Sequence, residues 1–304
     1  MRKFLVASTI CLAMAVGASS TSLASFDDGV SAYRNGDYAT ALAEFQKAAE
    51  QSNALAQYNL AVMHDDGLGV VQDYKKAVKW YAKAAEQGIA QAQFSLGVRY
   101  SNGQGVARDH SQAARWYRKA AEQGHASAQY NLGLKYDMGQ GVARDFKEAA
   151  KWYRKAAVQG HANAQYNLGL RLRDGEGVGK DDAEAAQWFR KAAEQRVTLA
   201  QYNLGVMYAK GQGVAKNAKE ALKWFHKAAE QGDAGAQFNL GAMYGKGEGV
   251  ERDIVQAHKW LNIAGANVSQ KGRDYIHILE EAMTPEQITI SLNLTRAWLK
   301  KREQ

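Results

Sequence analysis

The sequence predicts an all-α protein built as an α-solenoid, which is a row of stacked helix hairpins. Three observations support this prediction: a 36-residue period that occurs six times without insertion, apolar residues at helical spacing in two segments of each period, and a glycine pair between those segments. One glutamine and one tryptophan mark the phase of every repeat. The glutamines are Gln57, Gln93, Gln129, Gln165, Gln201 and Gln237, and the tryptophans are Trp80, Trp116, Trp152, Trp188, Trp224 and Trp260.

Each repeat contains two helical segments. In the repeat that begins at His125, Ala128, Leu132 and Tyr136 are four residues apart and therefore share one face of a first helix. The second segment has apolar residues at spacings of three and four. They are Ala149, Trp152, Tyr153 and Ala156. Each repeat therefore reads as a helix hairpin.

The segment between the two helices predicts a turn and a helix start. Gly139-Gln140-Gly141-Val142 has an equivalent Gly-x-Gly-Val in every repeat, and glycine tolerates the positive φ that ends one helix and redirects the chain. Asp145 follows, and Asp or Asn is a good N-cap for the second helix. The equivalent residues are Asp73, Asp109, Asp181, Asn217 and Asp253.

One hairpin of this kind cannot bury both of its apolar faces, whereas stacked copies can. We expect the tryptophan of each repeat to be the large side chain of the shared core, together with one leucine from each first helix. These leucines are Leu60, Leu96, Leu132, Leu168, Leu204 and Leu240.

The full pattern, A-x-A-Q-[YF]-N-L-G…G-x-G-V-x-x-D…A-x-x-W-[YF]-x-K-A-A-E-Q-G, resembles the Sel-one-like repeat, a 36-residue relative of the tetratricopeptide repeat. The resemblance covers residues 53–268. It implies a right-handed, tetratricopeptide-like superhelix and a role as a protein-binding adaptor. It implies no particular ligand.

The two ends of the chain depart from the repeat. Residues 1–24 are typical of a secretory signal, with Arg2 and Lys3 before an apolar run, and we expect cleavage after Ala24. The alternative is a membrane anchor, but the run is short for a span of about 30 Å. Residues 25–52 resemble a tetratricopeptide-type hairpin and are expected to cap the N-terminal end of the array.

Residues 269–304 are expected to form C-terminal capping helices over 271–283 and 285–301. Thr284-Pro285-Glu286-Gln287 predicts a helix start, with Thr284 as N-cap and Gln287 completing a capping box. The alternative is a separate helix that binds a partner.

Residues that vary between repeats are the better guide to binding, because the constant residues mostly serve packing. One position of the first helix carries Arg99, Lys135 and Arg171 in three consecutive repeats, with Asp137 and Asp174 beside this row. If first helices line the concave side, as in related repeats, these residues form a candidate groove for an acidic peptide or glycan. The alternative is a solvated face without a binding role.

No residue pattern predicts catalysis, a metal or a cofactor. The seven histidines lack metal-ligand spacing, and the glycines of the Gly175–Lys180 segment are explained by the turn. The only cysteine, Cys11, lies inside the predicted signal. A net charge of +8 is only mildly basic and does not specify nucleic acid.

The sequence therefore predicts an exported, non-catalytic scaffold, periplasmic or secreted, that binds a protein or peptide through its concave groove. The resemblance extends this to envelope regulation or contact with host proteins. We expect a monomer without nucleic-acid binding or stable membrane insertion. Two alternatives are a penicillin-binding or β-lactam-hydrolysing activity, as in cysteine-rich relatives whose repeats carry cysteine pairs absent here, and a binder of anionic polymers.

Overall fold

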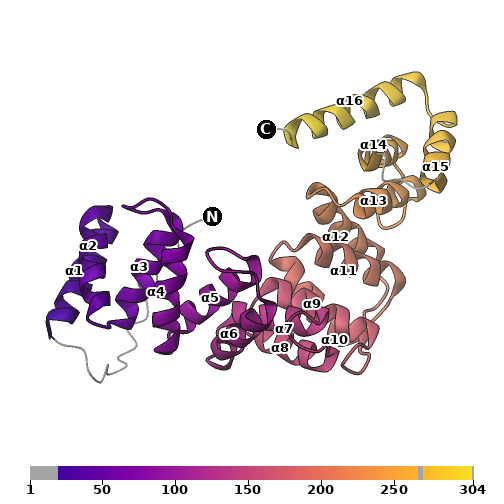
Figure 1. Cartoon of the computed structure of the whole chain (residues 1–304). Helices are drawn as coiled ribbons and strands as arrows, with labels where there is room; N and C mark the ends of the chain where they lie inside the picture. Colours follow the sequence, from indigo (N-terminus) through magenta and orange to yellow (C-terminus); the bar gives the residue numbers. More distant parts are fainter. Residues whose placement is uncertain (1–19, 266–269, 303–304) are drawn as a thin grey trace. The chain divides into compact units, whose positions relative to one another are not determined.

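A computed structural model of the chain describes residues 20–265 and 270–302 (Figure 1). All regular secondary structure in these two ranges is helical, in sixteen α-helices, as the sequence predicts. The first helices of the repeats are α3 (Ala54–Asp66), α5 (Ala90–Asn102), α7 (Ala126–Met138), α9 (Ala162–Asp174), α11 (Thr198–Lys210) and α13 (Ala234–Lys246). The second helices are α4 (Tyr74–Glu86), α6 (His110–Glu122), α8 (Phe146–Val158), α10 (Asp182–Glu194), α12 (Ala218–Glu230) and α14 (Ile254–Ala264). The flanking helices are α1 (Ser20–Arg34), α2 (Tyr38–Glu50), α15 (Gln270–Glu281) and α16 (Pro285–Arg302).

The chain divides into two compact units. The first comprises residues 1–128 and 140–142, and the second residues 129–139 and 143–304. Within each unit, helices that follow one another in the chain pack side by side, such as α3 with α4 and α9 with α10. Each hairpin thus shares its core with its neighbours in the same unit, as stacked repeats require.

The turn between α9 and α10 shows why two glycines recur. Gly175 ends α9 in the left-handed conformation with φ 73°, and the Asp181 carboxylate accepts the Glu184 N–H to begin α10. A Cβ on Gly177 would stand 2.2 Å from the backbone of Phe146, the first residue of α8. The second glycine therefore lets the loop approach the preceding repeat closely.

The core differs in one respect from the prediction. All six repeat leucines are buried, and so are Trp152, Trp188, Trp224 and Trp260, whereas Trp80 and Trp116 are only half-buried. The deeper large side chain is the residue after each tryptophan. A glycine of the first helix makes room for it in five repeats: in the fourth repeat, a Cβ on Gly169 would lie 2.8 Å from the Phe189 ring. In the first five repeats a lysine lies 4.2–4.4 Å from the centroid of the tryptophan ring, as Lys155 lies over Trp152 at 4.2 Å.

In four repeats the constant glutamine, which is Gln57, Gln93, Gln165 or Gln201, joins three helices. In the fourth repeat, Gln165 Nε2 donates to the Ala157 carbonyl at the end of α8 (3.1 Å), and its Oε1 accepts from Gln195 Nε2 beyond α10 (2.8 Å). Gln57 makes the same two contacts with Ala49 and Gln87. Since the last carbonyls of a helix have no partner within that helix, the buried glutamine supplies one.

The C-terminal helices pack on the last repeat. Thr284 and Gln287 form the predicted capping box, each donating its backbone N–H to the other's side chain (2.9 and 3.2 Å). On α16, Ser291 is fully buried and its Oγ lies 3.0 Å from Nδ1 of His258 on α14. The Trp298 ring meets the Trp260 ring edge-on, with centroids 6.0 Å apart.

At the other end, α1 begins at Ser20, so the predicted cleavage after Ala24 falls within this helix. The predicted signal segment lies mostly in residues 1–19, outside the described residues. No helix in the described ranges has both the length and the apolar character needed to cross a bilayer.

Candidate partner-binding surface

The predicted row of cations lies on the first helices, and its first member is held in an ion pair. Arg99 on α5 contacts the Asp65 carboxylate of α3 at 2.7 Å, and Tyr81 of α4 donates to the same carboxylate at 3.3 Å. The Arg99 guanidinium also lies over the Tyr74 ring, 5.2 Å from its centroid. Burial raises the pKa of Asp65, although Arg99 acts in the opposite direction. The Arg99 side chain retains only 16% of its exposure.

Arg171 repeats this arrangement in the second unit. Its guanidinium on α9 lies 3.5 Å from the Asp137 carboxylate of α7 and also contacts Glu176. Tyr153 of α8 donates to Asp137 at 3.1 Å, and the Phe146 ring lies 5.1 Å below the guanidinium. The contacts of Arg99 and Arg171 follow the same arrangement. In each, an aspartate, a tyrosine and a second aromatic ring from one repeat contact the arginine of the next repeat.

Lys135, the middle member of the predicted row, is 6% exposed. Burial lowers the pKa of its ammonium group. The three predicted cations therefore do not form an open basic row. Two are balanced by carboxylates of the preceding repeat, and the third is covered.

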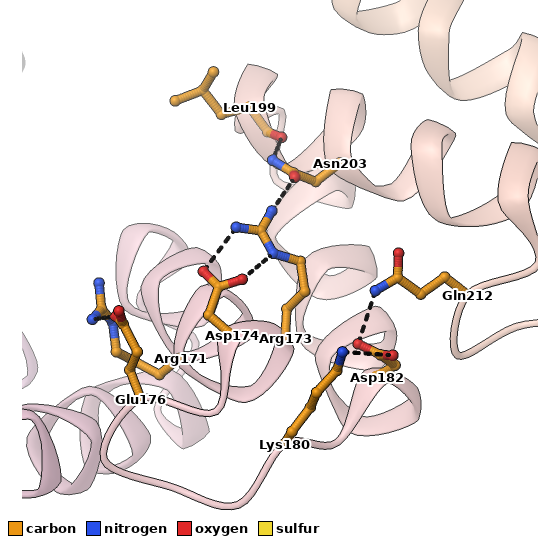
Figure 2. A network of polar contacts seen from close by, with 9 residues as sticks. All are labelled: Arg171, Arg173, Asp174, Glu176, Lys180, Asp182, Leu199, Asn203 and Gln212. Atoms are coloured by element: carbon orange, nitrogen blue, oxygen red, sulfur yellow. Dashed lines mark hydrogen bonds and ion pairs between the residues drawn. The ribbon is translucent and has the colours of Figure 1, made fainter.

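Asp174, in contrast, lies at the accessible end of α9 within a polar network (Figure 2). Arg173 holds its carboxylate with two hydrogen bonds of 2.7 and 2.8 Å, which lower the pKa of Asp174. A third guanidinium nitrogen donates to Asn203 of α11 at 2.8 Å, and Asn203 donates to the Leu199 carbonyl. Arg173 was not predicted from the sequence, because its position holds Asp, Ser, Ala or Gly in the other repeats.

The same network continues at the start of α10. Asp182 accepts a hydrogen bond from Gln212 of the following repeat at 3.0 Å and lies 3.8 Å from Lys180 (Figure 2). The surface near the α9–α10 turn therefore presents alternating charges that are tied to one another and to the next repeat.

The histidines at the repeat starts have structural contacts. His161 Nδ1 accepts the Ala164 N–H at 3.3 Å as an N-cap, and its ring stacks on Tyr130 with centroids 4.6 Å apart. Burial lowers the pKa of His161. Among the described residues no group of three or more His, Cys, Asp or Glu side chains is arranged to hold a metal ion.

The comparisons with known proteins agree with this architecture. The family model described as Sel1 repeat matches six consecutive segments, 54–89, 90–125, 126–161, 162–197, 198–233 and 234–267. The chain belongs to the Sel1 repeat family. The predicted family and the predicted fold class, an all-α solenoid of helix hairpins, are thereby confirmed.

Several solved structures resemble this Sel1 repeat chain. It is 36% identical to a Sel1 repeat protein from Oxalobacter formigenes, with a TM-score of 0.67 over 83% of this chain and 99% of that one. It is 31% identical to a protective antigen of uropathogenic Escherichia coli that displays the SLR fold, over 92% and 76% of the two chains with a TM-score of 0.42. Cysteine-rich protein B of Helicobacter pylori is 27% identical over 42% of this chain and 92% of that one, with a TM-score of 0.35. No curated protein matches the chain significantly.

Sel1 repeat proteins are generally non-catalytic scaffolds that bind other proteins. In this chain, the constant leucines of the first helices and the constant glutamines of the repeat are buried. The residues that vary between repeats include exposed ones such as Asp174 and Met138. The family features thus account for the fold, and the variable surface is what distinguishes this member.

Proposed function

We propose that this protein is an exported, non-catalytic scaffold that holds a protein or peptide partner, with the groove formed by the first helices as the binding face. The observation that carries the proposal is the contrast between a constant, buried set of repeat residues and a variable, exposed set at the ends of the first helices. A repeat array needs only the first set to fold. The second set is available for recognition.

The ion pairs of the arginines change which residues of the predicted site can contact a partner. In the second unit, Lys135 and Arg171 are largely buried, while Asp174 and Met138, which is 60% exposed, are accessible to a partner. Asp137 orients Arg171 and is not itself an open charge. The partner surface in this proposal is therefore mixed in charge, with one exposed apolar contact.

Affinity capture with the mature chain tests the binding role. The bait is the protein from residue 25 onward, beside a variant with Met138→Asp and Asp174→Lys, and a control with Lys219→Glu on the second helix α12. We expect a specific protein that the parent and the control retain and the double variant loses. Retention of the same protein by all three baits would remove the first-helix face from consideration, and the absence of any specific protein would contradict the scaffold role.

Export is tested separately by the N-terminus of the protein recovered from its native cell envelope or medium. We expect mass spectrometry to find Ser25 as the first residue. A protein that retains Met1 and remains in the cytoplasm would contradict the export proposal without affecting the binding proposal.

A further inference from the structure

The outward surface of α8 in the second unit carries a hollow of about 800 Å³. Its lining on α8 has four cations, one carboxylate and two apolar side chains: Lys147, Lys151, Arg154, Lys155, Glu148, Ala150 and Val158. Gly177 and Val178 of the following repeat close one end. The hollow therefore combines a cationic rim with apolar side chains.

The rim has more positive than negative charge. Lys151 lies 3.0 Å from Glu148, and Arg154 pairs with Glu184 of α10. Lys147 has no carboxylate within ion-pair distance among the described residues, and Lys155 lies over the Trp152 ring. Two positive charges are left unbalanced, at positions eight residues apart on α8.

Val158 sets this repeat apart. At the equivalent position, four other repeats carry a glutamate: Glu86, Glu122, Glu194 and Glu230. Val158 is 72% exposed, so packing within the chain does not require an apolar side chain here. The replacement removes a negative charge from the end of the hollow and adds an apolar contact. Scattered exposed apolar residues are common, but this one lies in the hollow that the unbalanced lysines line.

We infer that the α8 hollow docks an acidic amphipathic helix of a partner protein. Lys147, Lys151 and Lys155 are four residues apart, which spaces them about 6 Å along the helix axis. Glutamates four residues apart on a partner helix have the same spacing and can face all three lysines. An apolar side chain beside those glutamates covers Val158 and Ala150. A uniformly charged polymer has no group to place on these apolar side chains.

This inference rests on the proposed protein-binding role but concerns a different surface from the first-helix face. Asp174 and Met138 do not line the hollow. Loss of binding at the first-helix face therefore says nothing about the α8 hollow, and loss of binding at the hollow says nothing about the first-helix face.

A synthetic helix tests the inference with the full mature chain. The probe is a fluorescein-labelled 18-residue peptide with glutamates every four residues and leucines on the adjacent positions, compared by fluorescence anisotropy with a scrambled peptide of the same composition and with poly-glutamate. We expect the aligned peptide to bind about tenfold more tightly than either comparator, since its charges and apolar groups both match.

The test variants introduce residues that other repeats of the chain carry at the same positions. Val158→Glu restores the residue of four other repeats, and Lys147→Ser copies Ser111 of the second repeat, so both are compatible with the fold. Each is expected to weaken the aligned peptide about tenfold, whereas Lys219→Glu, at the Lys147 position two repeats later, leaves binding within about twofold.

Three results would overturn the inference: no binding of the aligned peptide, equal binding of the scrambled peptide or poly-glutamate, or an equal loss with Lys219→Glu. The last two would show that net charge alone governs association. None of them bears on a partner captured through the first-helix face, because that measurement uses Met138→Asp and Asp174→Lys.

Discussion

At the scale of single residues, equivalent positions of the repeat have different environments. Trp80 is half-buried under Lys83, whereas Trp260 is 1% exposed beneath Trp298 of α16 and beside His226. In the last repeat the C-terminal helix adds the Trp298 ring to the cover of Trp260. Residue type alone therefore does not set the contribution of a repeat tryptophan to stability.

Trp260→Ala is expected to destabilise the protein by about 3–5 kcal/mol, and Trp80→Ala by less, because a buried aromatic leaves a cavity whereas a half-buried one leaves partly solvated space. Urea unfolding of both variants, followed by circular dichroism, measures the difference. Equal losses at the two positions would contradict the assigned burial.

The Asp137–Arg171 pair leads to a second prediction at this scale. Removing one partner leaves a largely buried charge, so Asp137→Ala or Arg171→Met alone should cost about 2 kcal/mol, between the values for exposed and fully buried pairs. The double variant reproduces the Ala209 and Met243 found at the same positions two repeats later. It should be close to the parent in stability. A double-mutant cycle from urea unfolding checks this, and additive losses would show that the two residues act independently.

At the scale of the helix, the caps are chemically different from repeat to repeat. Asn53 and Asp233 accept the N–H three residues on at 2.9 and 2.7 Å, where His161 uses its ring nitrogen. Only the histidine changes its capping ability near neutral pH, because protonation of Nδ1 removes the acceptor. The start of α9 is therefore the pH-sensitive counterpart of the contact that Asn53 makes in the first repeat and Asp233 in the sixth.

The sign of the effect follows from the lowered pKa of His161. The folded protein favours the neutral ring, so its contribution to stability is present above the unfolded pKa of about 6.5 and is lost as pH falls through the lower folded value. His161→Asn keeps a cap without this titration. We expect the stability of the parent relative to the variant to fall as pH decreases below 6.5. A constant difference from pH 8 to pH 5, measured by thermal unfolding, would contradict this role.

At the scale of the molecule, stability depends on neighbouring repeats, as expected for an array whose hairpins share their cores. On the C-terminal repeat, α16 supplies the neighbour. It buries Ser291 against His258 and packs the Trp298 ring edge-on against Trp260. Arg302 donates to the Glu230 and Gln231 carbonyls at the end of α12 (3.3 and 3.2 Å). The predicted cap thus reaches back across more than one hairpin.

Deleting residues 284–304 should therefore loosen the last repeat first. We expect faster amide hydrogen exchange in α13 and α14, with α3–α6 protected as in the parent, because coupling acts mainly between neighbours. Hydrogen exchange followed by mass spectrometry resolves these helices. A uniform loss of protection along the chain would show that the array unfolds as one unit.

The sequence by itself determined the period, the two helices of each repeat and the buried leucines, because local helix geometry and capping chemistry specify them. Only the tertiary structure decided which side chains join one repeat to the next. Asp65 meets Arg99 and Gln165 reaches Ala157 because of the offset between stacked hairpins, which no single repeat contains. The candidate site changed for the same reason: charges that look open in one repeat are neutralised by the repeat before it.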